Sequence, residues 1–203
     1  MSDAATFPDT APRRSPVWRD AVRTLRRYAP GDPGQERLRT AYLQALEDDT
    51  AVFKTGPPVH LTTSCLVFDH TGEQVLLTLH TKARAWLQLG GHVEPGDPSL
   101  LAAVHREVRE ESGIDSVRIG PVPAELHRHG LGARFGRCAE HLDVRFVGWA
   151  PHESEAARSP ESLDLRWWPV DGLPPGTVAD LASLITRGQE ARRDLREVPL
   201  EPT

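Results

Sequence analysis

Three carboxylates within five residues are the strongest chemical signal in this chain. Glu107, Glu110 and Glu111 stand at positions i, i+3 and i+4, so on an α-helix they lie on one side. Like charges at this spacing destabilise an exposed helix by about 0.2–0.5 kcal/mol per pair. A divalent cation removes that repulsion, and hard ions such as Mg²⁺ or Mn²⁺ prefer carboxylate oxygens. The spacing therefore predicts a site for Mg²⁺ or Mn²⁺.

A turn and two capping signals frame the helix that carries these carboxylates. Residues 90–97 read Gly-Gly-His-Val-Glu-Pro-Gly-Asp, which is typical of a turn. Asp97 followed by Pro98 predicts the start of a helix, with Asp97 as the N-cap acceptor. Gly113 suits the C-cap at the other end.

The apolar positions of this helix define its buried side. They are Leu100, Leu101, Val104 and Val108. At about 100° per residue, Glu107 and Glu111 border this stripe, whereas His105 and Arg109 point to water. The carboxylates are thus expected at a seam between core and solvent, where a cleft can form.

These residues resemble the Nudix box of the MutT/Nudix hydrolases, Gly-x5-Glu-x7-Arg-Glu-apolar-x-Glu-Glu-x-Gly-apolar. Gly91 takes the first glycine, Asp97 takes the first acid, and residues 106–114 match the whole second half. Asp97 replaces a glutamate, and one extra residue lies between Asp97 and Arg106. Both differences fall in the turn before the helix, so they leave the second half intact and put a catalytic role for Asp97 in doubt.

The resemblance implies hydrolysis of a nucleoside diphosphate linked to another moiety, with Mg²⁺ or Mn²⁺ as cofactor. It implies that Glu107, Glu110 and Glu111, with the Gly91 carbonyl, are metal ligands, and that one glutamate is the base for the attacking water. It also implies that Arg106 orients Glu107 through a charge-assisted contact.

A further carboxylate from a late loop often completes such a site in the family. Glu161 is the first choice for this catalytic role. Glu155 and Glu153 follow it, and Glu140 and Asp143 are more distant candidates.

The predicted substrate-binding residues lie beside the glycine turn. They are Lys82, Arg84, Trp86 and His92. The two cations could grip phosphates or serve only solubility, and Trp86 could stack on a base or pack in the core. His60, His80 and His92 lie near strand or loop ends, where an imidazole could contact phosphate or bind a softer metal such as Mn²⁺ or Zn²⁺. The alternative for these three is an ordinary hydrogen-bonded histidine; His127, His129, His141 and His152 are expected at the surface.

The remaining pattern predicts an α/β fold, a Nudix-like α/β/α sandwich with a mixed β-sheet and a helix on each face. Period-two segments predict strands at 59–69, 74–80, 85–89, 115–127, 140–150 and 163–170. Helical spacing predicts helices at 17–28, 35–46 and 177–192. On the strand at 163–170, one of Trp167 and Trp168 should be buried and the other should face outward.

These elements divide the chain into four parts. Residues 1–15 are expected to be a disordered tail and 16–50 a helical hairpin that acts as a packing cap or dimer element. The resemblance implies that residues 55–195 form a Nudix hydrolase domain, and residues 196–203 are expected to be a C-terminal tail.

Composition limits the partners and the compartment. A net charge of −5 gives no support to a nucleic-acid polymer as partner, and we expect a small-molecule nucleoside diphosphate derivative instead. No apolar stretch is long enough to span a bilayer, and the polar N-terminus has no signal-peptide core, so we expect no membrane contact and a cytoplasmic location. Cys65 and Cys138 are read as free thiols with no metal-ligand spacing. A homodimer through the sheet or the hairpin is also expected.

Two other functions remain open from the sequence. An isopentenyl diphosphate isomerase resembles this fold and uses histidine and glutamate as metal ligands, although isomerisation does not need the intact carboxylate set. A non-catalytic Nudix domain that senses a nucleotide metabolite is the second alternative. The sequence does not name the moiety attached to the diphosphate.

Overall fold

The computed structural model describes residues 14–160 and 162–197, with side chains as far as residue 192. Its elements follow the order α1–α2–η1–β1–β2–β3–β4–α3–β5–β6–η2–β7–β8–α4. Glu161, the first thirteen residues of the predicted N-terminal tail and residues 198–203 of the predicted C-terminal tail lie outside the described residues.

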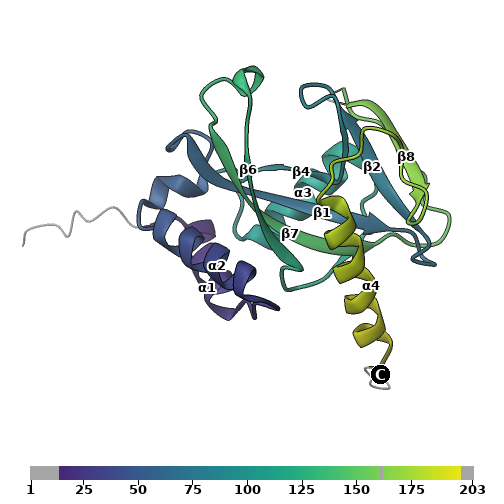
Figure 1. The fold of residues 1–203 in the computed structure, drawn as a ribbon, viewed down its shortest axis with the longest axis horizontal. Coiled ribbons are helices and arrows are strands. Elements are labelled where there is room, and N and C mark those ends of the chain that lie inside the picture. Colours follow the sequence, from purple (N-terminus) through teal and green to yellow (C-terminus); the bar gives the residue numbers. More distant parts are fainter. Residues whose placement is uncertain (1–13, 161, 198–203) are drawn as a thin grey trace, which may run out of the picture.

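One mixed sheet of eight strands forms the centre of the fold (Figure 1). The strands are β1 (Val59–Phe68), β2 (Gln74–His80), β3 (Trp86–Leu87), β4 (Leu89–His92), β5 (Arg118–Ile119), β6 (Glu125–Gly130), β7 (Glu140–Trp149) and β8 (Ser162–Pro169). β1 and β7 run parallel along their whole lengths, and the other strand pairs are antiparallel. The predicted strands are present, but 85–89 divides into β3 and the start of β4, and 115–127 divides into β5 and β6.

Helices cover both faces of the sheet, which explains why β1 is buried at every residue after Val59. On one face, Leu61 and Val67 join a core with α3 (Leu100–Ser112) and the N-terminal helices. On the other face, Leu66 and Phe68 pack with α4 (Leu181–Glu197). The predicted α/β/α sandwich with a mixed sheet is therefore confirmed.

The pair Trp167 and Trp168 corrects one expectation. Both side chains are half-buried, Trp167 against the core of α3 and Trp168 against the core of α4. Because each face of the sheet is covered, alternation on β8 sends neither indole fully into solvent.

The N-terminal hairpin consists of α1 (Pro16–Arg27) and α2 (Pro33–Ala45), followed by the short helix η1 (Asp49–Val52). It packs into the main core at one end of the sheet (Figure 1). The Gln35 side chain accepts a hydrogen bond from the backbone N–H of Leu126 at 2.8 Å and donates to the carbonyl of the same residue at 3.1 Å. Asp20 accepts from the N–H of Leu100 at 2.9 Å, at the start of α3. The hairpin is thus part of the packing around α3.

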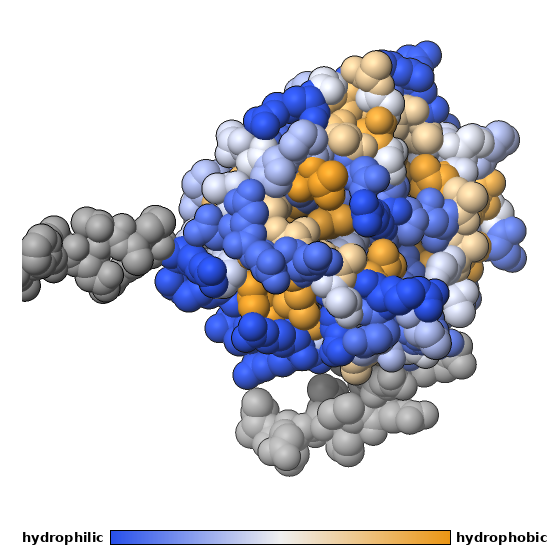
Figure 2. Space-filling view, turned by 60° about the vertical axis from the view of Figure 1, so that its left-hand side comes forward, coloured by the Kyte–Doolittle hydropathy of each residue, from blue (hydrophilic) through white to orange (hydrophobic). Residues whose placement is uncertain are grey.

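Figure 2 turns the side that carries the hairpin toward the viewer. Hydrophilic side chains cover most of this face, and apolar patches lie between them. The homodimer stays a prediction. Within the described residues, no helix combines the length and the apolar character needed to cross a bilayer.

Candidate active site

Helix α3 begins two residues later than the sequence predicted. Ser99 is its N-cap, and the Ser99 hydroxyl accepts from the N–H of Ala102 at 3.1 Å. Asp97 is not the cap, which corrects the expectation for that residue. The predicted end is confirmed, because Gly113 has φ 70° and its N–H donates to the carbonyl of Arg109.

Asp97 instead holds Arg106. Its two carboxylate oxygens accept from Nε of Arg106 at 3.1 Å and from Nη2 at 3.0 Å. The same carboxylate accepts from the N–H of Glu94 at 2.8 Å. Asp97 therefore ties the turn before α3 to the middle of the helix, and it does so from a buried position.

Arg106 is the hub of the carboxylate cluster. Its Nη1 donates to Glu107 at 2.8 Å and to Glu110 at 3.2 Å, and its Nη2 donates to the carbonyl of His92 at 2.9 Å. The hydrogen bond to Asp97, followed by the contact with Glu107, raises the pKa of Arg106 above its usual value. The guanidinium therefore stays charged and can orient Glu107, as the resemblance implied.

Two glutamates of α3 contact the glycine pair. A Cβ on Gly91 would lie 2.7 Å from the carboxylate of Glu107, so only glycine leaves room for that side chain. The N–H of Gly90 donates to Glu111 at 2.9 Å. Glu111 is buried, Glu107 is half-buried and Glu110 is mostly exposed. The three carboxylates therefore lie at the boundary between core and solvent, as predicted.

This donor set is suited to a hard divalent cation. It offers carboxylate oxygens at three depths, and the half-buried Glu107 lies against the backbone of Gly91. In the described structure Arg106 and the Gly90 amide engage the carboxylates, and the three do not converge on one point.

A second group of polar side chains lies on the sheet. Among the described residues, the group of His, Cys, Asp and Glu side chains whose ligand atoms all lie within 4.8 Å of one another is His60, His92, Cys138 and His141. His141 is half-buried rather than at the surface, which corrects its prediction. His127 and His129 are also half-buried rather than at the surface. They lie on β6, where they pair directly with Asp143 and His141 of β7. His152 is exposed, as predicted.

The family model of the NUDIX domain matches residues 58–187, well over half of the chain. The chain belongs to the NUDIX family. The matched segment contains the glycine turn, all of α3 and the sheet. The predicted family is therefore confirmed.

Individual relatives agree with this assignment. The chain is 28% identical over 163 residues to the 8-oxo-dGDP phosphatase NUDT18 of Danio rerio, and the match covers 74% of this chain and 46% of that protein. The chain thus spans about half the length of this relative.

Solved structures that share the fold include the following two. A NUDIX-family hydrolase from Clostridium perfringens has a TM-score of 0.52 and 24% identity over 67% of this chain and 97% of that one. An Ap4A hydrolase from C. elegans has a TM-score of 0.54 and 16% identity over 66% and 98%.

Among the described residues, no late carboxylate of this Nudix domain forms a close group with the glutamates of α3. Glu161 lies outside the described residues, and Glu153 and Glu155 are exposed. Glu140 forms an ion pair with Arg128. Asp143 is buried, and accepts from Thr62, Ser64 and Arg145. A carboxylate with this many donors is a structural anchor rather than a free base.

Sequence reasoning missed the network around Asp143. Arg145 is 3% exposed and contacts Asp143 and Glu125, each at 3.0 Å, and Asp180 at 2.6 Å. Alternation of charged and apolar residues along β7 was visible in the sequence, but it does not show that three carboxylates from different segments meet one guanidinium.

The predicted substrate-binding residues separate into two groups. Lys82 and Arg84 are exposed between β2 and β3, so both can reach a ligand. Trp86 is 8% exposed and packs edge-on against Trp168 in the core of α4, which favours the core-packing interpretation. His92 is half-buried and belongs to the group with His60, Cys138 and His141.

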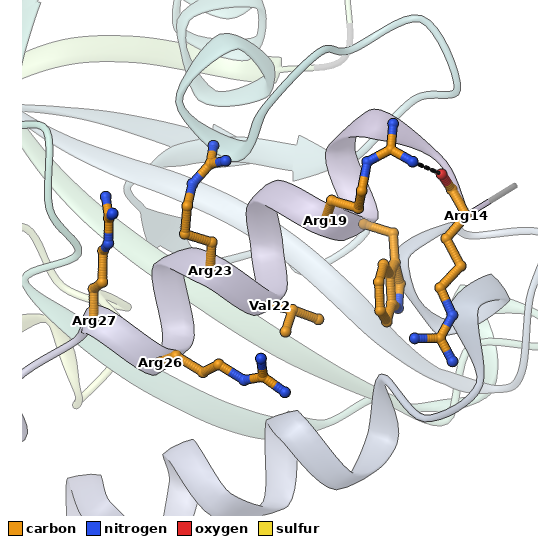
Figure 3. Close-up of a pocket in the computed structure, with 7 residues that line it drawn as sticks. Arg14, Arg19, Val22, Arg23, Arg26 and Arg27 are labelled. Atoms are coloured by element: carbon orange, nitrogen blue, oxygen red, sulfur yellow. Dashed lines mark hydrogen bonds between the residues drawn. The ribbon is translucent and has the colours of Figure 1, made fainter.

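A hollow of about 460 Å³ on the outer side of α1 is a separate basic surface. Figure 3 shows Arg19, Arg23, Arg26 and Arg27 projecting from this helix, with Arg14 just before it. None of the lining residues belongs to α3 or β4, so this hollow is not part of the carboxylate site.

Proposed function

We propose that this chain is a metal-dependent pyrophosphohydrolase that cleaves the diphosphate linkage of a nucleoside diphosphate derivative. The observation that carries the proposal is the order imposed on Glu107: Gly91 leaves space for its carboxylate, and Arg106, itself held by Asp97, fixes one of its oxygens. Such preorganisation is what a metal and an attacking water require. Nudix hydrolases generally use divalent metals, which agrees with this donor set.

Glu107, Glu110 and Glu111, with the Gly91 carbonyl, would hold Mg²⁺ or Mn²⁺. A bound ion supplies neutralisation of the diphosphate charge and lowers the pKa of a coordinated water. Glu110, the most exposed of the three, is free enough of the core to change its rotamer toward the water. Arg106 would keep Glu107 oriented throughout. Lys82 and Arg84, which are exposed in the loop after β2, would contact substrate phosphates.

The family and the names of two relatives support the proposed substrate class. NUDT18 of Danio rerio is named for action on 8-oxo-dGDP, and the C. elegans neighbour for action on Ap4A. Both names describe phosphoanhydrides of nucleosides. We therefore propose a nucleoside diphosphate derivative as the substrate, without naming the second moiety.

The test is a phosphate-release assay of the full chain on a panel of nucleoside diphosphate derivatives, with Mg²⁺ and Mn²⁺ in turn. Glu110→Gln should lower turnover by about 10²–10⁴-fold while the fold is retained, because loss of a ligand and base removes metal and proton-transfer catalysis together. Glu73→Gln, an exposed glutamate in the β1–β2 turn, is the matched control and should behave as the parent. Equal turnover of Glu110→Gln and parent contradicts the assignment of the site.

The same panel separates the two alternatives. Conversion of isopentenyl diphosphate to its allylic isomer, without phosphate release, would favour an isomerase. Binding of a nucleotide derivative without turnover in either metal would favour a sensing domain.

A further inference from the structure

The histidine–cysteine group consists of His60, His92, Cys138 and His141. Its three histidines come together through the register of three strands. His60 on β1 pairs directly with His141 on β7, and Thr62, two residues along β1, pairs with His92 on β4. Because alternate residues of a strand share one face, all three imidazoles lie on the same face of the sheet. Their ring centroids are 5.0–5.3 Å apart.

Hydrogen bonds from the residues on either side of Cys138 hold it beside the histidines. Arg137 donates to the carbonyls of Thr55 at 3.1 Å and Gly56 at 2.8 Å, and the N–H of Ala139 donates to the carbonyl of Pro58 at 2.8 Å. These bonds fasten the segment around Cys138 to the segment that leads into β1. The cysteine is buried, 6% exposed.

Each imidazole of the group has an unused nitrogen. Nε2 of His60, of His92 and of His141 is buried without a hydrogen-bond partner among the described residues. Buried polar atoms are normally paired, and an unpaired one costs free energy. Three such atoms in one group, with His60 completely buried, indicate a missing common partner.

The protonation states agree with a metal as that partner. Nδ1 of His60 lies 2.9 Å from the carbonyl of Pro57, so Nδ1 carries the proton and Nε2 presents its lone pair. Burial lowers the pKa of His92 to about 4 and that of His141 to about 3, and burial also lowers the pKa of His60. All three rings are therefore neutral near pH 7, as metal ligation requires.

We propose that His60, His92, Cys138 and His141 bind one Zn²⁺ ion in a tetrahedral site of three imidazoles and one thiolate. Nitrogen and sulfur donors favour Zn²⁺ over Mg²⁺ or Mn²⁺, and tetrahedral donors stand about 3.3–3.8 Å apart. Ligand atoms that already lie within 4.8 Å of one another need only small shifts to reach this spacing. On binding, the Cys138 thiol loses its proton to solvent and forms the Zn–S bond.

Four protein ligands close the coordination shell, so the role of this site is structural. The ion would join β1, β4 and β7 to the loop before β7. His92 follows Gly91 directly, and its carbonyl accepts from Arg106. The zinc would therefore fix the strand end on which the carboxylate site rests.

The test is metal binding by the full chain after treatment with a chelator and reductant. Excess Mg²⁺ is present throughout to occupy the carboxylates of α3. We expect one Zn²⁺ per chain, and with Co²⁺ as a probe we expect the visible bands of a tetrahedral ion and a thiolate-to-cobalt charge-transfer band. Absence of both the one-to-one stoichiometry and the charge-transfer band in the parent protein overturns the proposal without any variant.

Variants assign the ligands. Cys138→Ser, which keeps the size of the side chain, should lose the charge-transfer band and bind Zn²⁺ at least tenfold more weakly. His141→Gln should also weaken Zn²⁺ binding at least tenfold, whereas His152→Gln, at an exposed histidine, is the control and should bind as the parent. Parent-like Zn²⁺ affinity and Co²⁺ spectra in both Cys138→Ser and His141→Gln overturn the site.

Circular dichroism identifies a variant that has not folded. In that case the rate of alkylation of Cys138 in the parent protein decides. Zn²⁺ should slow this alkylation at least tenfold, and an unchanged rate contradicts the proposal.

The result does not depend on the hydrolase assignment. Glu110→Gln should bind Zn²⁺ as the parent does, because Glu110 lies on α3 and outside the histidine–cysteine group.

Discussion

The carboxylate cluster on α3 and the histidine–cysteine group on the sheet satisfy different physical requirements. The carboxylates come from one helix, carry net negative charge, and are held by a positive side chain, Arg106. The histidine–cysteine group comes from three strands and a loop, is buried at His60 and Cys138 and half-buried at His92 and His141, and is electrically neutral in its imidazoles. A cluster of like-charged side chains needs a counter-charge in the folded protein. Neutral side chains can be buried without one, and only their lone pairs then lack hydrogen-bond partners. The two sets should therefore respond to different metals and different mutations.

Metal exchange gives the largest expected difference. Complete removal of metal with a chelator should reduce turnover by about 100-fold or more, because a catalytic ion contributes several kcal/mol to transition-state stabilisation. Mg²⁺ or Mn²⁺ should restore turnover, whereas one equivalent of Zn²⁺ should raise Tm and leave turnover low. Turnover and Tm measured on the same samples check this. Full activity with one equivalent of Zn²⁺ and no other ion would place hydrolysis in the histidine–cysteine group.

Gly91→Ala tests the carboxylate site alone. The new Cβ would lie 2.7 Å from the Glu107 carboxylate, which must move, and displacement of about 1 Å can cost about 100-fold in rate. Steady-state kinetics should show the loss in kcat. Gly96→Ala is the matched control, because nothing lies within 4 Å of its Cβ position and its rate should match the parent. A Gly91→Ala enzyme with parental kcat would mean that Glu107 does not need this position.

Arg106→Lys tests whether the two sites are coupled. Lysine cannot keep the contacts to Asp97, Glu107, Glu110 and the His92 carbonyl together, so we expect kcat to fall by about tenfold, the equivalent of one charge-assisted hydrogen bond. Arg109→Lys, on the exposed side of the same helix, should have no effect. Zinc affinity should change much less than kcat. An equal loss in both would show that the two sites act as one unit.

The smallest expected effect concerns the hairpin and not the chemistry. Asp20→Asn keeps an acceptor oxygen but removes the negative charge at the first N–H of α3, and loss of such a charge at a partly buried helix N-terminus costs about 1 kcal/mol. For a chain of this size that corresponds to a fall in Tm of about 2–4 °C. Thermal unfolding of Asp20→Asn and of the exposed control Asp115→Asn measures the difference. An identical Tm for both variants contradicts a supporting role of the hairpin for α3.

The carboxylate site could be predicted because its signal is local. Glu107, Glu110 and Glu111 are neighbours in sequence and on one helix, and the alternation along β1 and β7 marked both as strands. The predicted start of α3 was wrong because aspartate before proline is a common N-cap. The carboxylate of Asp97 instead accepts from Arg106, nine residues later. The competition between the two contacts is decided by the three-dimensional path of the turn.

The histidine–cysteine group could be predicted only in part. His60 and His92 were recognised as residues near strand ends, but Cys138 was read as a free thiol without metal-ligand spacing and His141 was expected at the surface. What the sequence does not contain is the parallel register that pairs His60 with His141. Parallel partners come from distant segments, so no periodic pattern reports which residues face each other.

The paired hydrogen bonds between Gln35 and Leu126 have a consequence for solubility. An outer strand with free amides and carbonyls is a template on which a second chain can add. By occupying both backbone polar groups of Leu126, the second residue of β6, the glutamine side chain interrupts that template near its start. A form of the protein shortened beyond α2 should therefore tend to associate edge to edge.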